Sequence, residues 1–168
     1  MVKVNPSGNI TSTVKERSFT LERIFDAPRE LIFKAFTKPE YVSRWWAPGS
    51  YTIPVCNIDL RPGGIWHYCM ESPEGERHWA MSVYREIDDP ERLVYTGCFA
   101  DEEANPIDGI PEHLVTVTLD EHEGKTKVTI HVELGSAKEL EATLNMGMKE
   151  GLTMCVDQNL VKVLENMQ

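Results

Sequence analysis

The chain has 168 residues, of which 41% are hydrophobic and 26% charged, and it contains four Trp, five Tyr and five Phe. This length and aromatic content predict one folded domain with its own core and argue against disorder as the main state. The formal net charge of −10 argues against a protein of duplex nucleic acids or anionic membrane surfaces, because phosphate contacts require a basic surface.

The N-terminal residues and the cysteines indicate a cytoplasmic protein. Residues 1–17 are polar and lack the apolar core of a signal peptide, so we expect a flexible lead-in before a domain at 18–168. No stretch approaches the roughly 18 consecutive apolar residues of a membrane span. The four cysteines include no C-x-x-C pair, which favours free thiols over a disulfide scaffold or a zinc site.

The domain is expected to begin with a strand and two short helices. Residues 18–25 alternate so that Phe19 and Leu21 share one face, which strict alternation extends to Arg23. Pro28 suits the first turn of a helix, because backbone N–H groups there have no partner within the helix and the N–H that proline lacks is not needed. Thr37 and Glu40 have the spacing of a capping box, so we expect a second short helix after them.

Six further strands are expected, separated by turns rich in Gly, Pro and Asp. They are residues 51–60, 65–71, 78–87, 93–99, 113–119 and 126–134. The last of them alternates apolar and polar side chains, as a half-buried antiparallel strand does. Strands grouped between helices predict an α+β fold with about seven antiparallel strands.

The C-terminal segment predicts one long helix. Ser136 and Glu139 form a second capping box, and about 30 residues without proline follow. Gly147 and Gly151 lie within this helix, where each costs about 1 kcal/mol relative to alanine. Two explanations remain open. The glycines allow a bend or close packing on the sheet, or they leave space for a ligand beneath the helix.

Four short motifs occur in order along the chain: FDAPRE at 25–30, RWWAP at 44–48, DLRPGG at 59–64 and PERLV at 90–94. Together they resemble the family of heat-shock-protein-90 ATPase activator homologues, within the START-like (SRPBCC, birch-pollen-allergen-like) superfamily. The resemblance covers residues 18–168 and implies a helix-grip fold, in which a curved antiparallel sheet wraps a long C-terminal helix. It also implies a cavity for small apolar or amphipathic molecules between sheet and helix.

The chain departs from that family at two positions. Gly151 is followed by Leu152 where many relatives have Gly-Trp, and Ser82 replaces a common glycine. For this chain we expect a ligand cavity lined by Trp46, Trp66, Tyr68, Met70, Tyr95, Phe99, Met148, Leu152 and Cys155, with His113 at its rim. Each of these aromatic side chains is also explained by packing in an ordinary core.

Other kinds of site find weaker support. His67, Cys69 and His78 lie on consecutive expected strands, but whether they meet as metal ligands depends on the register. Cys56 faces Cys69 only if the Pro62–Gly63 loop has two residues. Asp59 and Arg61 flank that turn and are expected to pair. No nucleophile elbow, Walker loop or dinucleotide fingerprint occurs, so we assign no catalytic residue, metal or cofactor.

Three functions remain open at this point. The first is a non-enzymatic binding protein that holds a small lipophilic molecule, oriented by Tyr, Ser or His at the rim. The second is a co-chaperone that contacts a chaperone ATPase through its acidic surface, as the resemblance implies. The third is a cyclase or hydrolase that uses the same cavity.

Overall fold

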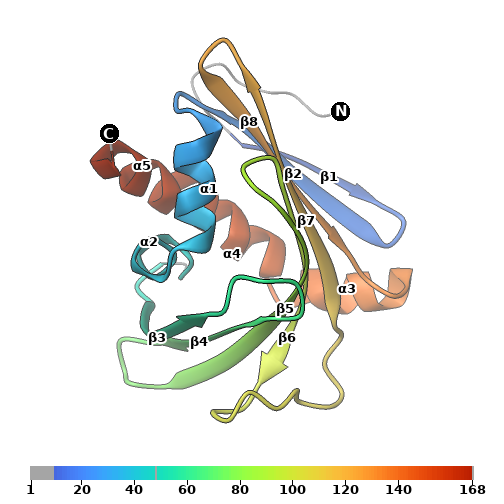
Figure 1. Cartoon of the computed structure of the whole chain (residues 1–168). Coiled ribbons are helices and arrows are strands. Elements are labelled where there is room, and N and C mark those ends of the chain that lie inside the picture. Colours follow the sequence, from blue (N-terminus) through green and yellow to red (C-terminus); the bar gives the residue numbers. More distant parts are fainter. Residues whose placement is uncertain (1–9, 48, 168) are drawn as a thin grey trace.

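The structure is a computed structural model that describes residues 10–47 and 49–167. Its centre is a single curved antiparallel sheet in the order β1-β2-β8-β7-β6-β5-β4-β3 (Figure 1). The eight strands are β1 (Thr11–Lys15), β2 (Ser18–Phe25), β3 (Thr52–Ile58), β4 (Ile65–Glu71), β5 (Arg77–Asp88), β6 (Arg92–Ala100), β7 (His113–His122) and β8 (Lys125–Glu133).

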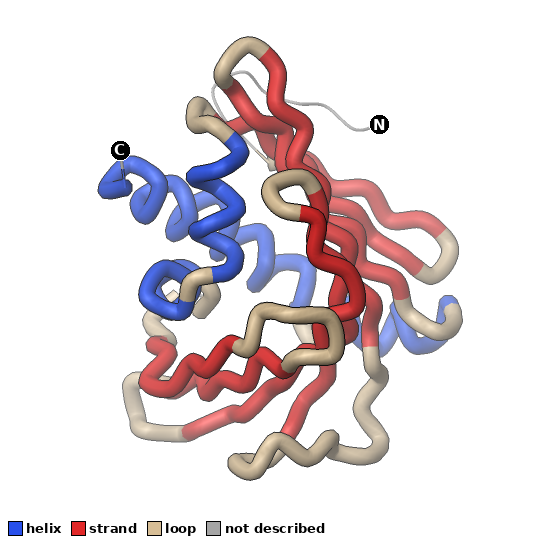
Figure 2. The backbone as a smooth tube through the Cα atoms, in the orientation of Figure 1, coloured by secondary structure: helices blue, strands red, loops and turns tan. Residues whose placement is uncertain are grey.

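The helices gather mainly on one side of this sheet, as Figure 2 shows. Two short helices follow β2, and the C-terminal helical segments cross the concave face. The helical elements are α1 (Arg29–Thr37), α2 (Pro39–Trp45), α3 (Ala137–Asn145), α4 (Met148–Met154), the π-helical segment η1 (Cys155–Leu160) and α5 (Val161–Met167). The α+β helix-grip fold expected from the sequence is therefore confirmed. None of the helices in the described part of the chain is long and apolar enough to span a membrane.

The sheet has one strand more than the seven expected. β1 lies at residues 11–15, which the sequence analysis had placed in the lead-in; residues 1–9 lie outside the described residues. It pairs with β2 from Thr11↔Glu22 to Lys15↔Ser18 at the edge of the sheet. Four of its five residues are exposed, so its sequence lacks the apolar alternation that marks a half-buried strand.

The C-terminal helix is confirmed in its position, but it is interrupted. Ser136 caps α3 as expected, its hydroxyl accepting from the Glu139 N–H at 3.1 Å. The helix then breaks at Gly147, whose φ of +83° is left-handed and unfavourable for other residues. The bend is thus one reason for a glycine there.

Two local expectations were wrong. Thr37 does not cap α2, because its hydroxyl donates to the Phe33 carbonyl at 2.7 Å and Lys38 occupies the N-cap. Cys56 pairs with Tyr68, and Val55 with Cys69, because the β3–β4 turn is longer than two residues. The two cysteines are therefore not opposite each other, and both are free thiols.

Candidate ligand-binding cavity

A cavity of about 260 Å³ lies between the concave face of the sheet and the C-terminal helices. Its lining includes eight of the nine residues expected there, and also His113. The expected residues that line this space are Trp46, Tyr68, Met70, Tyr95, Phe99, Met148, Leu152, Cys155 and His113. Tyr68 and Met70 share a face of β4 because side chains two positions apart point the same way, and Tyr95 and Phe99 share a face of β6 for the same reason.

Trp66 was expected in the lining but lies outside it. Its ring is enclosed by three other aromatic rings, with centroids 4.9 Å from Trp46, 4.8 Å from Tyr68 and 5.8 Å from Tyr95. It is 3% exposed and fills the core next to the cavity. Sequence alternation could not separate it from Tyr68, because both point to the same face.

Sequence reasoning missed part of the lining. The additional lining residues are Ala80, Met81, Ser82, Gly97, Cys98, Ile110, Pro111, Val115, Val132, Thr143, Met146, Gly147 and Gly151. None has an aromatic ring, and apart from Gly147 and Gly151 their residue types gave no indication of a ligand site. Gly147 and Gly151 border the cavity, and the space beneath them is thus a second reason for glycine beside the bend.

The end of the cavity near α2 is held by contacts with η1. The Cys155 thiol donates to the Trp46 carbonyl at 3.2 Å, and Asn159 Nδ2 donates to the Ala47 carbonyl at 2.9 Å. These bonds satisfy carbonyls that the end of α2 leaves without helical partners. They place Trp46 against the C-terminal helix.

The opposite end is formed by β6, β7 and α3. His113 lies over Gly97, its partner on the neighbouring strand, so that a Cβ at position 97 would be 2.6 Å from His113 Nε2. Burial lowers the pKa of His113 to about 4, so the imidazole is neutral at pH 7. His113 thus lies on the floor of the cavity and not only at its rim.

The cavity is uncharged and opens to solvent beside α3. Among residues 10–47 and 49–167, no Asp, Glu, Lys or Arg lines it. Burial raises the pKa of Tyr68 and of Cys155 to about 12, and it raises the pKa of Tyr95 well above 10. Met146 borders the cavity and is 53% exposed, so the entrance lies at the break between α3 and α4.

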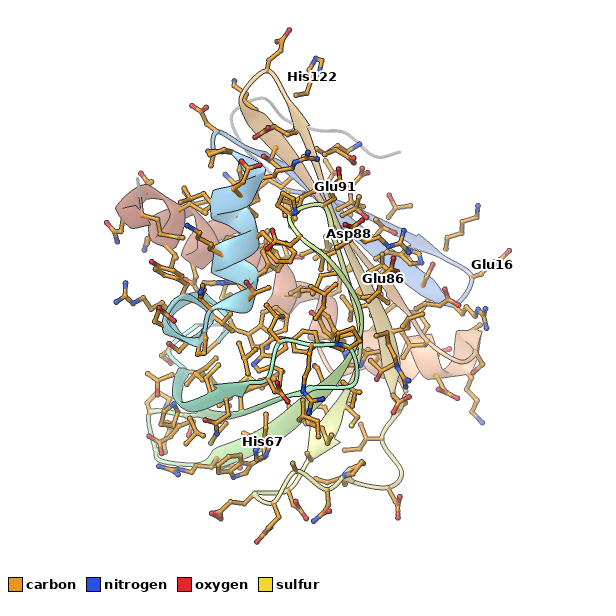
Figure 3. All side chains as sticks on the ribbon, in the orientation of Figure 1. Glu16, His67, Glu86, Asp88, Glu91 and His122 are labelled. Atoms are coloured by element: carbon orange, nitrogen blue, oxygen red, sulfur yellow. The ribbon has the colours of Figure 1, made fainter. Side chains whose placement is uncertain are left out.

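The residues considered for a metal site do not meet. His67 pairs across the ladder with Met81, while His78 pairs with Met70, which places them three positions apart. The described residues contain no group of three His, Cys, Asp or Glu side chains arranged to hold a metal ion. His67 donates from Nε2 to the Asp101 carbonyl oxygen at 3.0 Å, and Figure 3 shows it far from His122.

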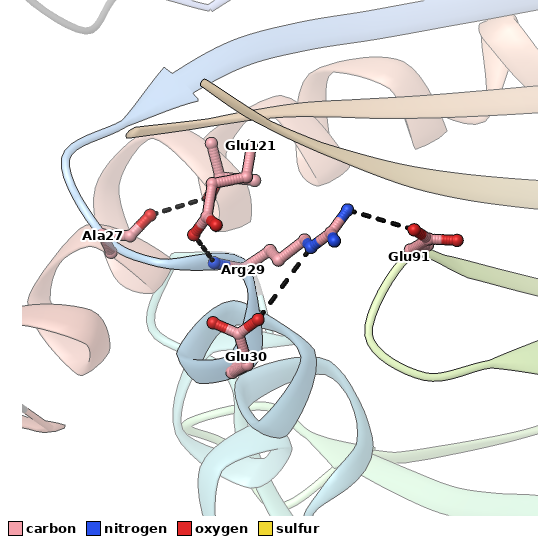
Figure 4. A network of polar contacts seen from close by, with 6 residues as sticks. Ala27, Arg29, Glu30, Glu91 and Glu121 are labelled. Carbon is pink, nitrogen blue, oxygen red and sulfur yellow. Dashed lines mark hydrogen bonds and ion pairs between the residues drawn. The ribbon is translucent and has the colours of Figure 1, made fainter. Parts of the chain in front are cut away.

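The first and third sequence motifs stabilise a helix start and a turn, whereas the second motif contributes Trp46 to the cavity. Arg29 joins the first motif to the fourth through an ion pair with Glu91 at 3.3 Å, and its N–H donates to Glu121 at 3.0 Å (Figure 4). In the third motif Arg61 pairs with Asp59 at 2.8 Å, as expected. A Cβ at Gly64 would overlap the Asp59 carbonyl oxygen, so this turn requires glycine.

Comparisons with known proteins agree with this architecture. Residues 26–165 match the family described as Activator of Hsp90 ATPase homolog 1-like protein. No protein of curated function matches the chain. A crystal structure from Mycobacterium smegmatis is 29% identical, with 93% of this chain and 95% of that chain covered and a TM-score of 0.82.

Two solution structures have the same fold. One from Arthrobacter aurescens is 26% identical over 94% of this chain and 91% of that chain, with a TM-score of 0.85. Another from Staphylococcus epidermidis is 24% identical over 93% of this chain and 94% of that chain, with a TM-score of 0.81. The family match covers most of the sequence and agrees with the motifs and the fold. The chain therefore belongs to the family of Activator of Hsp90 ATPase homolog 1-like proteins.

Proposed function

We propose that this protein binds a small hydrophobic or amphipathic molecule in the cavity between sheet and C-terminal helices, within the cytoplasm. The observation that carries the proposal is the uncharged, mostly apolar lining around about 260 Å³ of space. Transfer of apolar surface into such a site stabilises a complex by about 25 cal/mol per Å². A few polar side chains then orient the ligand.

The ionisation of the lining favours binding over catalysis. General acid–base chemistry is most efficient when the pKa of the catalytic group is near the working pH. In the cavity the pKa of His113 is about 4, and the pKa values of Tyr68 and Cys155 are about 12. Thiolate chemistry at Cys155 is disfavoured for the same reason. These groups support a binding site more than a cyclase or hydrolase.

The proposal is tested by narrowing the cavity. Ala80 lies on the floor and is 6% exposed, so Ala80→Leu extends a side chain into the space. The neutral probe N-phenyl-1-naphthylamine, whose fluorescence rises in apolar surroundings, should bind the native protein and bind Ala80→Leu at least tenfold more weakly. Native mass spectrometry of freshly purified protein is expected to show a bound lipophilic molecule.

The matched control is the same substitution on the surface. Ala142 lies on the exposed face of α3 and does not line the cavity, so Ala142→Leu should bind the probe as the native protein does. Equal probe binding by the native protein and both variants would show that the probe does not occupy this cavity. The proposal would then fail.

A second candidate function rests on the family match. The family description names an activator of the Hsp90 ATPase, and the net charge of −10 suits contact with a basic surface. We propose as the alternative that the protein modulates a chaperone ATPase. The test is the turnover rate of a bacterial Hsp90 with and without the protein at low and high salt. A salt-sensitive change in rate supports this alternative, and an unchanged rate contradicts it.

A further inference from the structure

Four polar side chains face the cavity without a hydrogen-bond partner among the described residues. They come from neighbouring strands and the helix opposite: Ser82 on β5, Tyr95 on β6, His113 on β7 and Thr143 on α3. Ser82, Tyr95 and Thr143 are 4%, 3% and 5% exposed. Their polar atoms are accessible from the cavity, since none of them is among the fully enclosed unpartnered atoms of the described residues. A bound molecule can therefore supply hydrogen-bond partners to them.

The strand register places Ser82, Tyr95 and His113 at neighbouring positions of the cavity floor. Ser82 is opposite Gly97, and Gly97 is opposite His113, so the three positions form a row across β5, β6 and β7. Gly97 leaves space in the middle of the row, which the His113 ring covers. Tyr95 is two residues before Gly97 on the same face of β6. The sheet thus places three polar residues at neighbouring positions of the cavity floor.

Deepening the function proposed above, we propose that the ligand is an uncharged amphiphile with a hydroxyl or carbonyl group. That group hydrogen-bonds to the cluster of Ser82, Tyr95 and His113, while the apolar body of the ligand lies against the methionines and aromatic rings. Hydroxyls and a neutral imidazole can donate to a carbonyl, and they can both donate to and accept from a hydroxyl.

The same lining disfavours a carboxylate. It contains no Lys or Arg, and the desolvation of a carboxylate without a paired charge is costly. His113 does not supply the missing charge near pH 7, because burial holds its pKa near 4. Fatty-acid-like anions should therefore bind more weakly than alcohols or ketones of the same shape.

Three probes of one shape separate the possibilities: naphthalene, 2-naphthol and 2-naphthoate, measured by titration calorimetry at pH 7. We expect 2-naphthol to bind at least tenfold more tightly than either of the others. Tyr95→Phe removes only a hydroxyl and should lower the affinity for 2-naphthol by about threefold to tenfold, the effect of losing one neutral hydrogen bond. Naphthalene affinity should change by less than about twofold in the same variant.

Tyr84→Phe is the matched control. Tyr84 is 1% exposed and its hydroxyl also lacks a partner, with its ring centroid 6.1 Å from that of Tyr95, but it does not line the cavity. This variant should bind all three probes as the native protein does. Ser82→Ala provides a second loss of a cavity hydroxyl with little change in volume.

The outcomes distinguish the inference from the function on which it rests. Equal binding of naphthalene and 2-naphthol, or tightest binding of 2-naphthoate, would overturn the neutral-amphiphile inference and leave a binding cavity in place. Equal loss in Tyr95→Phe and Tyr84→Phe would also overturn it. If none of the three probes binds, and Ala80→Leu does not affect the fluorescent probe, the binding function itself fails.

Discussion

Gly97 and His113 are neighbours on β6 and β7, and the absence of a side chain at position 97 lets the imidazole lie over the sheet. The pair determines how much of the cavity floor is polar. Because no charged residue lines the cavity, burial of the ring is the physical cause of its low pKa.

Gly97→Ala should displace His113, because the new Cβ would be 2.6 Å from Nε2. Overpacking of this kind costs about 1–3 kcal/mol, and the mobility of a ring tip favours the lower end. Urea unfolding should show that Gly97→Ala lowers the unfolding free energy of the native protein but not that of the His113→Ala variant. Equal losses in both backgrounds would mean that the contact is not the cause.

His113 should also make the protein less stable in mild acid. Its pKa falls from 6.5 to about 4 on folding, so between these values the unfolded chain binds the proton more tightly. The neutral, buried His113 contributes fully to the free energy of unfolding above pH 6.5, and this contribution is lost as the pH falls from 6.5 to 4. The total loss is about 3 kcal/mol. Unfolding free energies at pH 7 and pH 4.5 should differ more for the native protein than for His113→Gln. The same pH dependence in both proteins would contradict the prediction.

The C-terminal helical segments are shaped by two local features. Gly147 breaks the helix beside the cavity entrance, and η1 forms a π-helix where it meets β2. At that point Arg23 Nη1 lies 3.3 Å from Asp157 Oδ1 and donates to the Asp157 carbonyl oxygen at 3.0 Å. The wider π turn coincides with this attachment, and π turns are common at functional sites.

Asp157→Ala should loosen the attachment of the helix to the sheet. The Arg23 side chain is only 11% exposed, so removal of its partner leaves a largely buried charge unpaired. We expect a loss of about 2 kcal/mol in unfolding free energy. The control is Asp59→Ala, which breaks an exposed pair with Arg61 and should change stability by less than about 0.5 kcal/mol. Similar losses of unfolding free energy in the two variants would show that the Arg23–Asp157 pair contributes no more to stability than an exposed ion pair.

Under the proposed function, a ligand in the cavity would stabilise the whole molecule. The sheet and the C-terminal helices contact each other around this space, so a ligand that binds only the folded state stabilises the entire fold by mass action. The family membership and the helix-grip architecture agree with such a design, since the fold places apolar space between its two layers.

A thermal-shift measurement with 2-naphthol should therefore show stabilisation. At a free concentration 100 times the dissociation constant, the gain is about 2.7 kcal/mol, which corresponds to a rise in Tm of roughly 5–10 °C for a chain of this size. Ala80→Leu should show no rise, while Ala142→Leu should show the full rise. A rise in Ala80→Leu would place the probe elsewhere on the protein.

Much of the site was predictable where a local periodicity decides orientation. Alternation grouped Tyr68 and Met70 on one face of β4, whereas Tyr95 and Phe99 were chosen only because they are aromatic. The Ser136 cap and the Asp59–Arg61 pair were also predictable, because in each the two partners lie within three residues of each other in the sequence. The edge strand β1 was not, since an exposed strand carries no apolar pattern.

The amino-acid sequence by itself determined the α+β class and the faces of three strands through periodicity, and four short motifs indicated the family and, through it, the helix-grip fold. Only the tertiary structure decided that Trp66 is core, that Gly147 breaks the helix and that Ser82 and His113 share a row. Those facts depend on strand register and on which layer covers which face. Register joins residues far apart in the chain, and no local pattern of side chains specifies it.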